Sequence, residues 1–130
     1  ISRVNPQSLR AYNQALAAYG HGDLIEAINL ATDALQYDRG NIWAHVLRAS
    51  CYAAYRDLAK AVDDYRELGI PLPCIVASEN ASLRDGDKVV AKLRQGDKVY
   101  AIRAEGERLY VEVRLVDGVK AGWVEQSKLE

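Results

Sequence analysis

Apolar residues recur at steps of three and four positions from residue 8 to residue 68, which is the period of an amphipathic helix. This region is rich in Ala and Leu and contains no proline, so it predicts helices. From residue 80 to residue 125 the pattern changes to short alternating runs such as "KVVAKL" and "LYVEVRLV", separated by "RDGD", "RQGD", "AEGE" and "VDGV". Alternation broken by such turns predicts strands joined by hairpins. Helices followed by strands predict an α+β chain in two domains.

The segment "GIPLPCIVASEN" separates the two patterns. Gly69 can end the last helix, and Pro71 and Pro73 cannot continue one. We therefore predict a helical domain over residues 1–69, an extended linker over 70–79, and a β domain over 80–130.

The helical region repeats itself at a spacing of 34 residues. The matched positions carry small, acidic or aliphatic side chains: Ala15 with Ala49, Asp23 with Asp57, Leu24 with Leu58, Ala27 with Ala61, and Ile28 with Val62. A fixed period with small residues at the same phases is typical of stacked helical hairpins, because close-packed helices admit only small side chains where they cross.

These residues resemble two tetratricopeptide repeats. The residues that carry the resemblance are Ala15, Ala27 and Ala34 with the turn "GHGD", and Ala49, Tyr52, Ala61 and Tyr65 with the turn "YRD". The pattern departs from the family at Leu68, where an alanine is usual, and at Arg39, where a proline is usual. The resemblance implies an all-α domain of about four helices in hairpins. Three repeats are normally needed to bury a continuous core, so another element is expected to cover an open end.

The resemblance also implies a binding groove on the first helix of each repeat. The expected groove residues are apolar or aromatic: Leu9, Tyr12, Leu16, Tyr19, Trp43 and Val46. Tyr12 and Leu16 occupy phases where the family's carboxylate clamp has Lys and Asn, so a partner helix or hydrophobic peptide is the expected ligand. Alternatively the stripe is core, because an aromatic stripe at helical spacing must be covered somewhere. The linker "GIPLPCIV" is apolar enough to cover it.

Residues 80–129 resemble a bacterial Src-homology-3 domain, through "SLRDG", "VVAKLRQGDKV", "LYVEVRL" and "GWVEQSKL". The resemblance implies a small all-β barrel. The residues agree: Leu109, Val111, Val113 and Leu115 alternate inward, and a hairpin turn is expected at "DG", residues 117–118. Tyr100, Tyr110 and Trp123 are the expected ligand face, although Trp123 can instead be barrel core. The family is common in the bacterial cell envelope and linked to cell-wall peptides, which favours an envelope or periplasmic location over the cytoplasm.

Charge limits the partners. The net charge is −1, and neither half of the chain has a basic excess, which argues against nucleic acid. No apolar run approaches the length of a membrane span, so direct membrane insertion is not expected.

Candidate catalytic groups are sparse. Cys51 and Cys74 are expected to be a helical hydrophobe and a linker residue rather than a disulfide, and His21 and His45 lack partners at metal-ligand spacing. We expect no enzyme, no metal and no cofactor. The expected function is a non-catalytic scaffold or adaptor that binds a protein or peptide through the groove. The alternative is an envelope protein whose barrel binds cell-wall peptide or peptidoglycan, with the repeats as a spacer.

Overall fold

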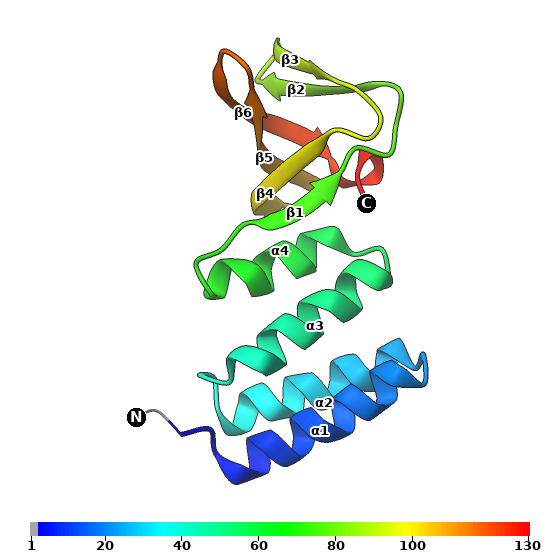
Figure 1. Cartoon of the computed structure of the whole chain (residues 1–130), viewed down its shortest axis with the longest axis vertical. Coiled ribbons are helices and arrows are strands. Elements are labelled where there is room, and N and C mark those ends of the chain that lie inside the picture. Colours follow the sequence, from blue (N-terminus) through cyan, green and yellow to red (C-terminus); the bar gives the residue numbers. More distant parts are fainter. Residues whose placement is uncertain (1–2) are drawn as a thin grey trace. The chain divides into compact units, whose positions relative to one another are not determined.

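The computed structural model describes residues 3–130 as four helices followed by a six-stranded antiparallel sheet (Figure 1). The helices are α1 (Pro6–Gly20), α2 (Leu24–Tyr37), α3 (Ile42–Ala54) and α4 (Leu58–Glu67). The strands are β1 (Leu72–Ile75), β2 (Ala81–Asp85), β3 (Lys88–Leu93), β4 (Lys98–Glu105), β5 (Arg108–Leu115) and β6 (Gly118–Glu125), followed by the 3-10 helix η1 (Gln126–Lys128). The α+β arrangement predicted from the sequence is confirmed at this level.

The chain divides into two compact units between Asp57 and Leu58. We call the first the helical unit, which contains α1 to α3, and the second the mixed unit, which contains α4 and all six strands. The sequence pattern placed residues 58–69 with the preceding helices. In the structure α4 packs against β4, and part of the expected linker forms strand β1. The boundary between the two compact units therefore lies before α4, whereas the sequence pattern changes from helical to strand-like only after α4.

Side-chain caps begin the helices of the helical unit. Asn5 accepts a hydrogen bond from the Gln7 amide at 2.8 Å, and Pro6 supplies a first residue that needs no amide partner. Asp23 and Asn41 begin α2 and α3 in the same way. The polar residues between the apolar runs therefore fix where each helix starts.

The 34-residue repeat extends to the backbone hydrogen bonds of the turns. The amide groups of Asp23 and Asp57 each donate to a carbonyl five residues earlier, over 3.0 and 2.8 Å. The preceding residues, Gly22 and Arg56, both have positive φ, at 80° and 70°. Glycine adopts this conformation without strain, whereas arginine does not. The two helix ends thus share one geometry despite different residues.

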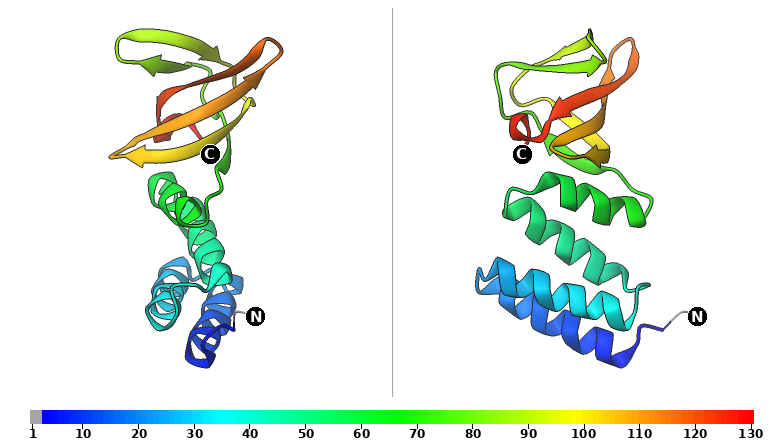
Figure 2. Two further views of the ribbon diagram at one scale, coloured as in Figure 1. Left: turned by 90° about the vertical axis from the view of Figure 1, so that its left-hand side faces the viewer. Right: turned by 180° about the vertical axis from the view of Figure 1, so that it is seen from behind.

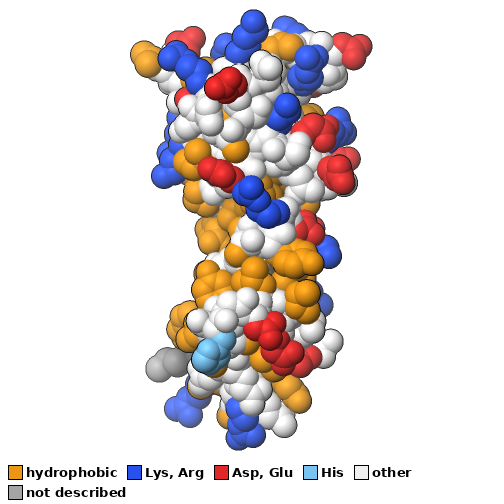
Figure 3. Space-filling model, turned by 90° about the vertical axis from the view of Figure 1, so that its right-hand side faces the viewer, with side chains coloured by type: hydrophobic (Ala, Val, Ile, Leu, Met, Phe, Trp, Pro, Cys, Tyr) orange, Lys and Arg blue, Asp and Glu red, His pale blue; other side chains and the backbone are white. Residues whose placement is uncertain are grey.

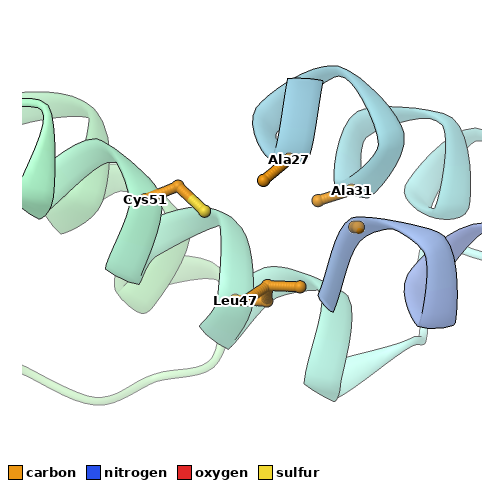
Figure 4. Packing of buried hydrophobic residues seen from close by; sticks show 5 residues of the cluster. Ala27, Ala31, Leu47 and Cys51 are labelled. Atoms are coloured by element: carbon orange, nitrogen blue, oxygen red, sulfur yellow. The ribbon is translucent and has the colours of Figure 1, made fainter. Parts of the chain in front are cut away.

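Alanines form much of the core of the helical unit. One cluster contains Ala15, Ala27, Ala31, Leu47 and Cys51, which come from α1, α2 and α3 (Figure 4). The three alanines and Cys51 are fully buried. Small side chains at these positions let the helices approach closely, which is the packing that the repeated alanines predicted.

A buried polar pair joins α1 to the start of α3. The Ser8 hydroxyl donates to the Ala34 carbonyl at 2.6 Å, and the Asn41 side-chain amide donates to the Ser8 hydroxyl at 2.9 Å. The Asn41 side-chain oxygen also accepts from the Ala44 amide at 3.1 Å. Ser8 and Asn41 are both fully buried, so these hydrogen bonds replace the water that burial removed.

The sheet of the mixed unit is open. Its strand order is β1-β4-β5-β6-β2-β3, all neighbours antiparallel. Figure 2 shows how strongly the sheet twists and bends. The prediction of a closed barrel is wrong for the described residues, because β1 and β3 are the two ends of the ladder and do not pair with each other. A register shift in β2–β3 bends this end of the sheet without joining it to β1.

Strand β5 follows the predicted alternation for most of its length. Leu109, Val111 and Val113 are buried, but Leu115 is 41% exposed, so its predicted inward position is wrong. Leu115 pairs with Gly118, which makes Val116 and Asp117 the two-residue turn, one position earlier than expected. The last residue pair of the β5–β6 hairpin, Leu115 with Gly118, lies beyond the core. The apolar residues of β5 therefore still alternate at Leu115, but Leu115 is not buried there.

Gly122 lies where β6 crosses β2. A Cβ atom at this position would lie 3.0 Å from the Arg84 carbonyl oxygen and 3.1 Å from the Leu83 Cβ. Only glycine leaves room for this approach, which explains the glycine of "GWV" in packing terms.

Gly69 ends α4 as the sequence predicted. It has a φ of 73°, and the Ile70 amide donates to the Tyr65 carbonyl at 3.2 Å, while the Gly69 amide donates to the Arg66 carbonyl at 2.9 Å. This pair of hydrogen bonds is the Schellman arrangement. It leaves Ile70 46% exposed at the start of the connection to β1.

Candidate binding surfaces

The predicted groove residues of α1 fall into two groups. Leu9, Leu16 and Tyr19 are exposed, at 41%, 46% and 39% of their surface. Tyr12 is half-buried and packs against both hydrophobic clusters of the helical unit. The stripe therefore has an exposed part and one residue that is partly core.

The corresponding residues of α3 show the same division. Trp43 is 58% exposed near the start of the helix, and Val46 is half-buried. Ala44 and Leu47, which point to the next face, are buried in the two clusters. Because α1 and α3 contact each other, the two rows lie on neighbouring helices. We call Leu9, Leu16, Tyr19 and Trp43 the apolar face.

Further exposed apolar side chains were not predicted as ligand contacts. Ile25 and Tyr37 on α2, Ile42 on α3 and Tyr55 after it are each more than half exposed. Figure 3 shows patches of apolar side chains among polar and charged ones on one face of the molecule. A shallow hollow of about 480 Å³ beside α1 is lined by Pro6, Leu9 and Ala17 together with polar side chains. No pattern in the sequence separates these residues from core positions.

The predicted ligand face of the β region is assembled by strand pairing. Tyr110 on β5 is opposite Trp123 on β6, and their rings meet edge to face with centroids 5.2 Å apart and planes at 65°. Arg103 on β4 is opposite Tyr110, and Arg84 on β2 is opposite Trp123. The pairing thus forms one row across four strands, in the order Arg103, Tyr110, Trp123, Arg84. Tyr100 lies in the next row, opposite Glu112.

Arginines stack on these rings, and sequence reasoning missed them. The Arg103 guanidinium carbon lies 5.1 Å from the Tyr110 ring centre and 5.2 Å from that of Trp123. Arg108 lies 5.0 Å from Trp123. The Arg114 guanidinium carbon lies 4.7 Å from the Tyr100 ring centre. These are cation–π distances. We call these rings and arginines, with Arg84, the arginine–aromatic face.

A bulge in β4 directs Arg103 to this face. The pairing with β5 shifts between Ala101, which is opposite the buried Val111, and Arg103, which is opposite Tyr110. Without the extra residue, strict alternation would point Arg103 and Ala101 to the same, inner side. Alternation read from the sequence cannot reveal such a bulge, which is why Arg103 was missed.

Two hollows flank the arginine–aromatic face, both within the mixed unit. The first, of about 340 Å³, has Arg84, Arg108 and Lys128 among its lining residues, against one acid, Glu125. The second, of about 510 Å³, has Arg66, Arg103 and Arg114, against Glu112. Each hollow therefore carries an excess of positive charge, although the whole chain is nearly neutral.

The two cysteines are unpaired and buried, Cys51 in α3 and Cys74 in β1. Desolvation raises the pKa of both thiols, that of Cys74 to about 11. A thiol with a raised pKa is a weak nucleophile near neutral pH. Among residues 3–130 no three metal-ligating side chains gather into a possible metal site, and none of the described helices has the length and hydropathy of a membrane span.

Comparison of the chain with family models, with curated proteins and with solved structures finds no match.

Proposed function

We propose that the chain is a non-catalytic interaction protein that binds a partner helix or peptide through the apolar face of α1 and α3. The single observation that supports this proposal is the exposure of Leu9, Leu16, Tyr19 and Trp43 on two neighbouring helices. Exposed apolar side chains grouped on one surface are typical of docking sites. The proposal includes the tetratricopeptide assignment, which the repeated turn geometry and the buried alanines of the helical unit support.

Trp43 is the proposed anchor of the partner. It is 58% exposed, so its ring is available to fill a pocket on a partner. Large aromatic side chains often dominate binding energy at protein interfaces, and truncating one typically costs about 2 kcal/mol or more, which is about thirtyfold in affinity.

Affinity capture with the intact chain and matched variants tests the proposal. Leu16→Asp places a charge within the apolar face, and Ile25→Asp makes the same change at an exposed position of α2. A partner of the proposed kind is retained by the original chain and by Ile25→Asp, and is lost with Leu16→Asp and Trp43→Ala. Circular dichroism confirms that each variant is folded. If Leu16→Asp unfolds the helical unit, or if both aspartate variants retain the same proteins, the apolar face is not the binding site.

A second candidate function belongs to the mixed unit. We propose, as the alternative, that a bacterial Src-homology-3-like unit binds cell-wall peptide or peptidoglycan, with the helices as a spacer. The stacked and partly exposed Tyr110 and Trp123 support it, because such rings can hold a flat or extended ligand. Pelleting with insoluble peptidoglycan tests it: retention that is lost in Tyr110→Ala supports the alternative, and absence of retention removes it.

A further inference from the structure

The arginine–aromatic face presents cationic groups that are held by rings. The contacts described above for Arg103, Arg108 and Arg114 are to Tyr110, Trp123 and Tyr100 rather than to carboxylates. A guanidinium stacked on a ring keeps its N–H donors in its own plane, where they remain able to bind an acceptor. Stacking also fixes the orientation of the group, so less conformational entropy is lost on binding.

Positive charge is concentrated at two places along this face. The two flanking hollows together are lined by six basic side chains, Arg66, Arg84, Arg103, Arg108, Arg114 and Lys128, and by two acidic ones. Carboxylates are the natural partners of such groups, because a guanidinium can bind a carboxylate through two parallel hydrogen bonds. The hollows differ in their other residues, and the larger one adds the apolar side chains of Ile70, Pro71 and Ile102.

The spacing of the hollows limits the shape of the ligand. The smaller hollow is lined by residues of β2 and β6 and by Arg108 at the start of β5, and the larger one includes residues of β4 and of the later part of β5. The row from β2 to β4 crosses three strand intervals, a width of about 14 Å at about 4.8 Å per interval. An extended peptide advances about 3.3 Å per residue, so about four residues cover this width.

We propose that the arginine–aromatic face binds an extended acidic segment of a partner protein, with two carboxylate side chains about four residues apart. One carboxylate binds in each hollow, and an apolar side chain beside one of them contacts Ile70 and Ile102 in the larger hollow. Charge complementarity supports this occupant. A nucleic acid is the less favoured polyanion because the chain as a whole has 17 basic and 18 acidic residues, so its long-range field does not attract a long polyanion. This surface is separate from the apolar face, so either proposal can fail alone.

Fluorescence anisotropy with the full chain and labelled synthetic peptides tests the proposal. The probe is a dodecapeptide blocked at both ends that carries two Glu residues four positions apart and one neighbouring Ile. One control peptide has Gln at both positions, and another has the two Glu residues adjacent. We expect the probe to bind about tenfold or more tightly than the Gln peptide, more tightly than the adjacent-Glu peptide, and less tightly as NaCl is raised.

Variants of the chain locate the site. Arg103→Gln with Arg108→Gln is expected to weaken binding of the probe about tenfold or more, whereas Lys92→Gln, on an exposed part of β3 outside both hollows, leaves it unchanged. Glu112→Gln removes the acid of the larger hollow and is expected to tighten binding. Unfolding cannot increase affinity. The Glu112→Gln variant therefore still tests the site if the double arginine variant fails to fold.

Four outcomes overturn the proposal. These are no binding of the probe, equal binding of the probe and the Gln peptide, tighter binding of a single-stranded oligothymidylate of twelve nucleotides than of the probe, and retention by insoluble peptidoglycan without binding of the probe. The last two outcomes assign the face to nucleic acid or to the cell wall, respectively.

Discussion

Replacing Ser8 with alanine tests the buried polar pair of the helical unit. The change removes the hydroxyl that accepts from the Asn41 amide at 2.9 Å and donates to the Ala34 carbonyl at 2.6 Å. The Ala34 carbonyl keeps a hydrogen bond from the Asp38 amide at 3.0 Å, but the described acceptor of the Asn41 side-chain amide is lost. A buried donor without a partner costs about 1–3 kcal/mol, and the higher helix propensity of alanine returns about 0.5 kcal/mol. The expected loss of unfolding free energy is therefore about 0.5–2.5 kcal/mol.

Chemical and thermal unfolding followed by far-ultraviolet circular dichroism measures this loss. For a domain of this size we expect the unfolding temperature to fall by roughly 2–20 °C. Trp43 fluorescence in a Trp123→Phe background reports on the helical unit alone, because these are the only two tryptophans in the chain. Ser50→Ala is the matched control, since the Ser50 hydroxyl donates only to the Val46 carbonyl of its own helix and its removal should change stability by less than about 0.5 kcal/mol. Equal effects of the two substitutions would refute the argument that the Ser8 hydroxyl holds the helices together.

Three further predictions concern backbone geometry and a buried thiol. Gly22→Ala should lower stability by about 1 kcal/mol because φ is 80° there, whereas Gly20→Ala, inside α1, should not; thermal unfolding compares them. Gly122→Ala should cost about 1–3 kcal/mol through the close approach of β2, and Ala121→Val on the neighbouring, half-exposed position should be nearly neutral by urea unfolding. Burial raises the pKa of Cys74 to about 11, so the unfolded thiol, near 9.0, loses its proton first and stability falls as pH rises between these values. Cys74→Ala should remove that part of the fall in urea unfolding across this pH range.

The parts of the fold that could be predicted from the sequence are those set by local residue patterns. Helical periodicity, alternation and the glycine at position 69 each act within a few residues, so the order of helices and strands and the end of α4 follow from them. The 34-residue period similarly predicted equivalent turns, which the hydrogen bonds of Asp23 and Asp57 confirm.

The features that could not be predicted depend on pairing between distant segments. No local residue pattern distinguishes an extended linker from a short edge strand. The sequence pattern therefore predicted a linker at Leu72–Ile75, although these residues form β1 and pair with β4. Whether a sheet closes depends on its two edge strands, which no single run of residues specifies. The same holds for Arg103, because the bulge that turns it outward is visible only against β5.

The repeat also helps to separate packing residues from binding residues in the helical unit. Positions 9 and 43 share a phase of the 34-residue period, and Leu9 and Trp43 are both exposed there. Positions 12 and 46 share the next phase, and Tyr12 and Val46 are both half-buried. A phase that is exposed in both α1 and α3 has no role in the helix packing of the helical unit. Helix packing does not explain large apolar side chains at that phase, whereas it explains Tyr12 through the two clusters that Tyr12 contacts. The binding proposal consequently depends on Leu9 and Trp43 more than on the other predicted groove residues.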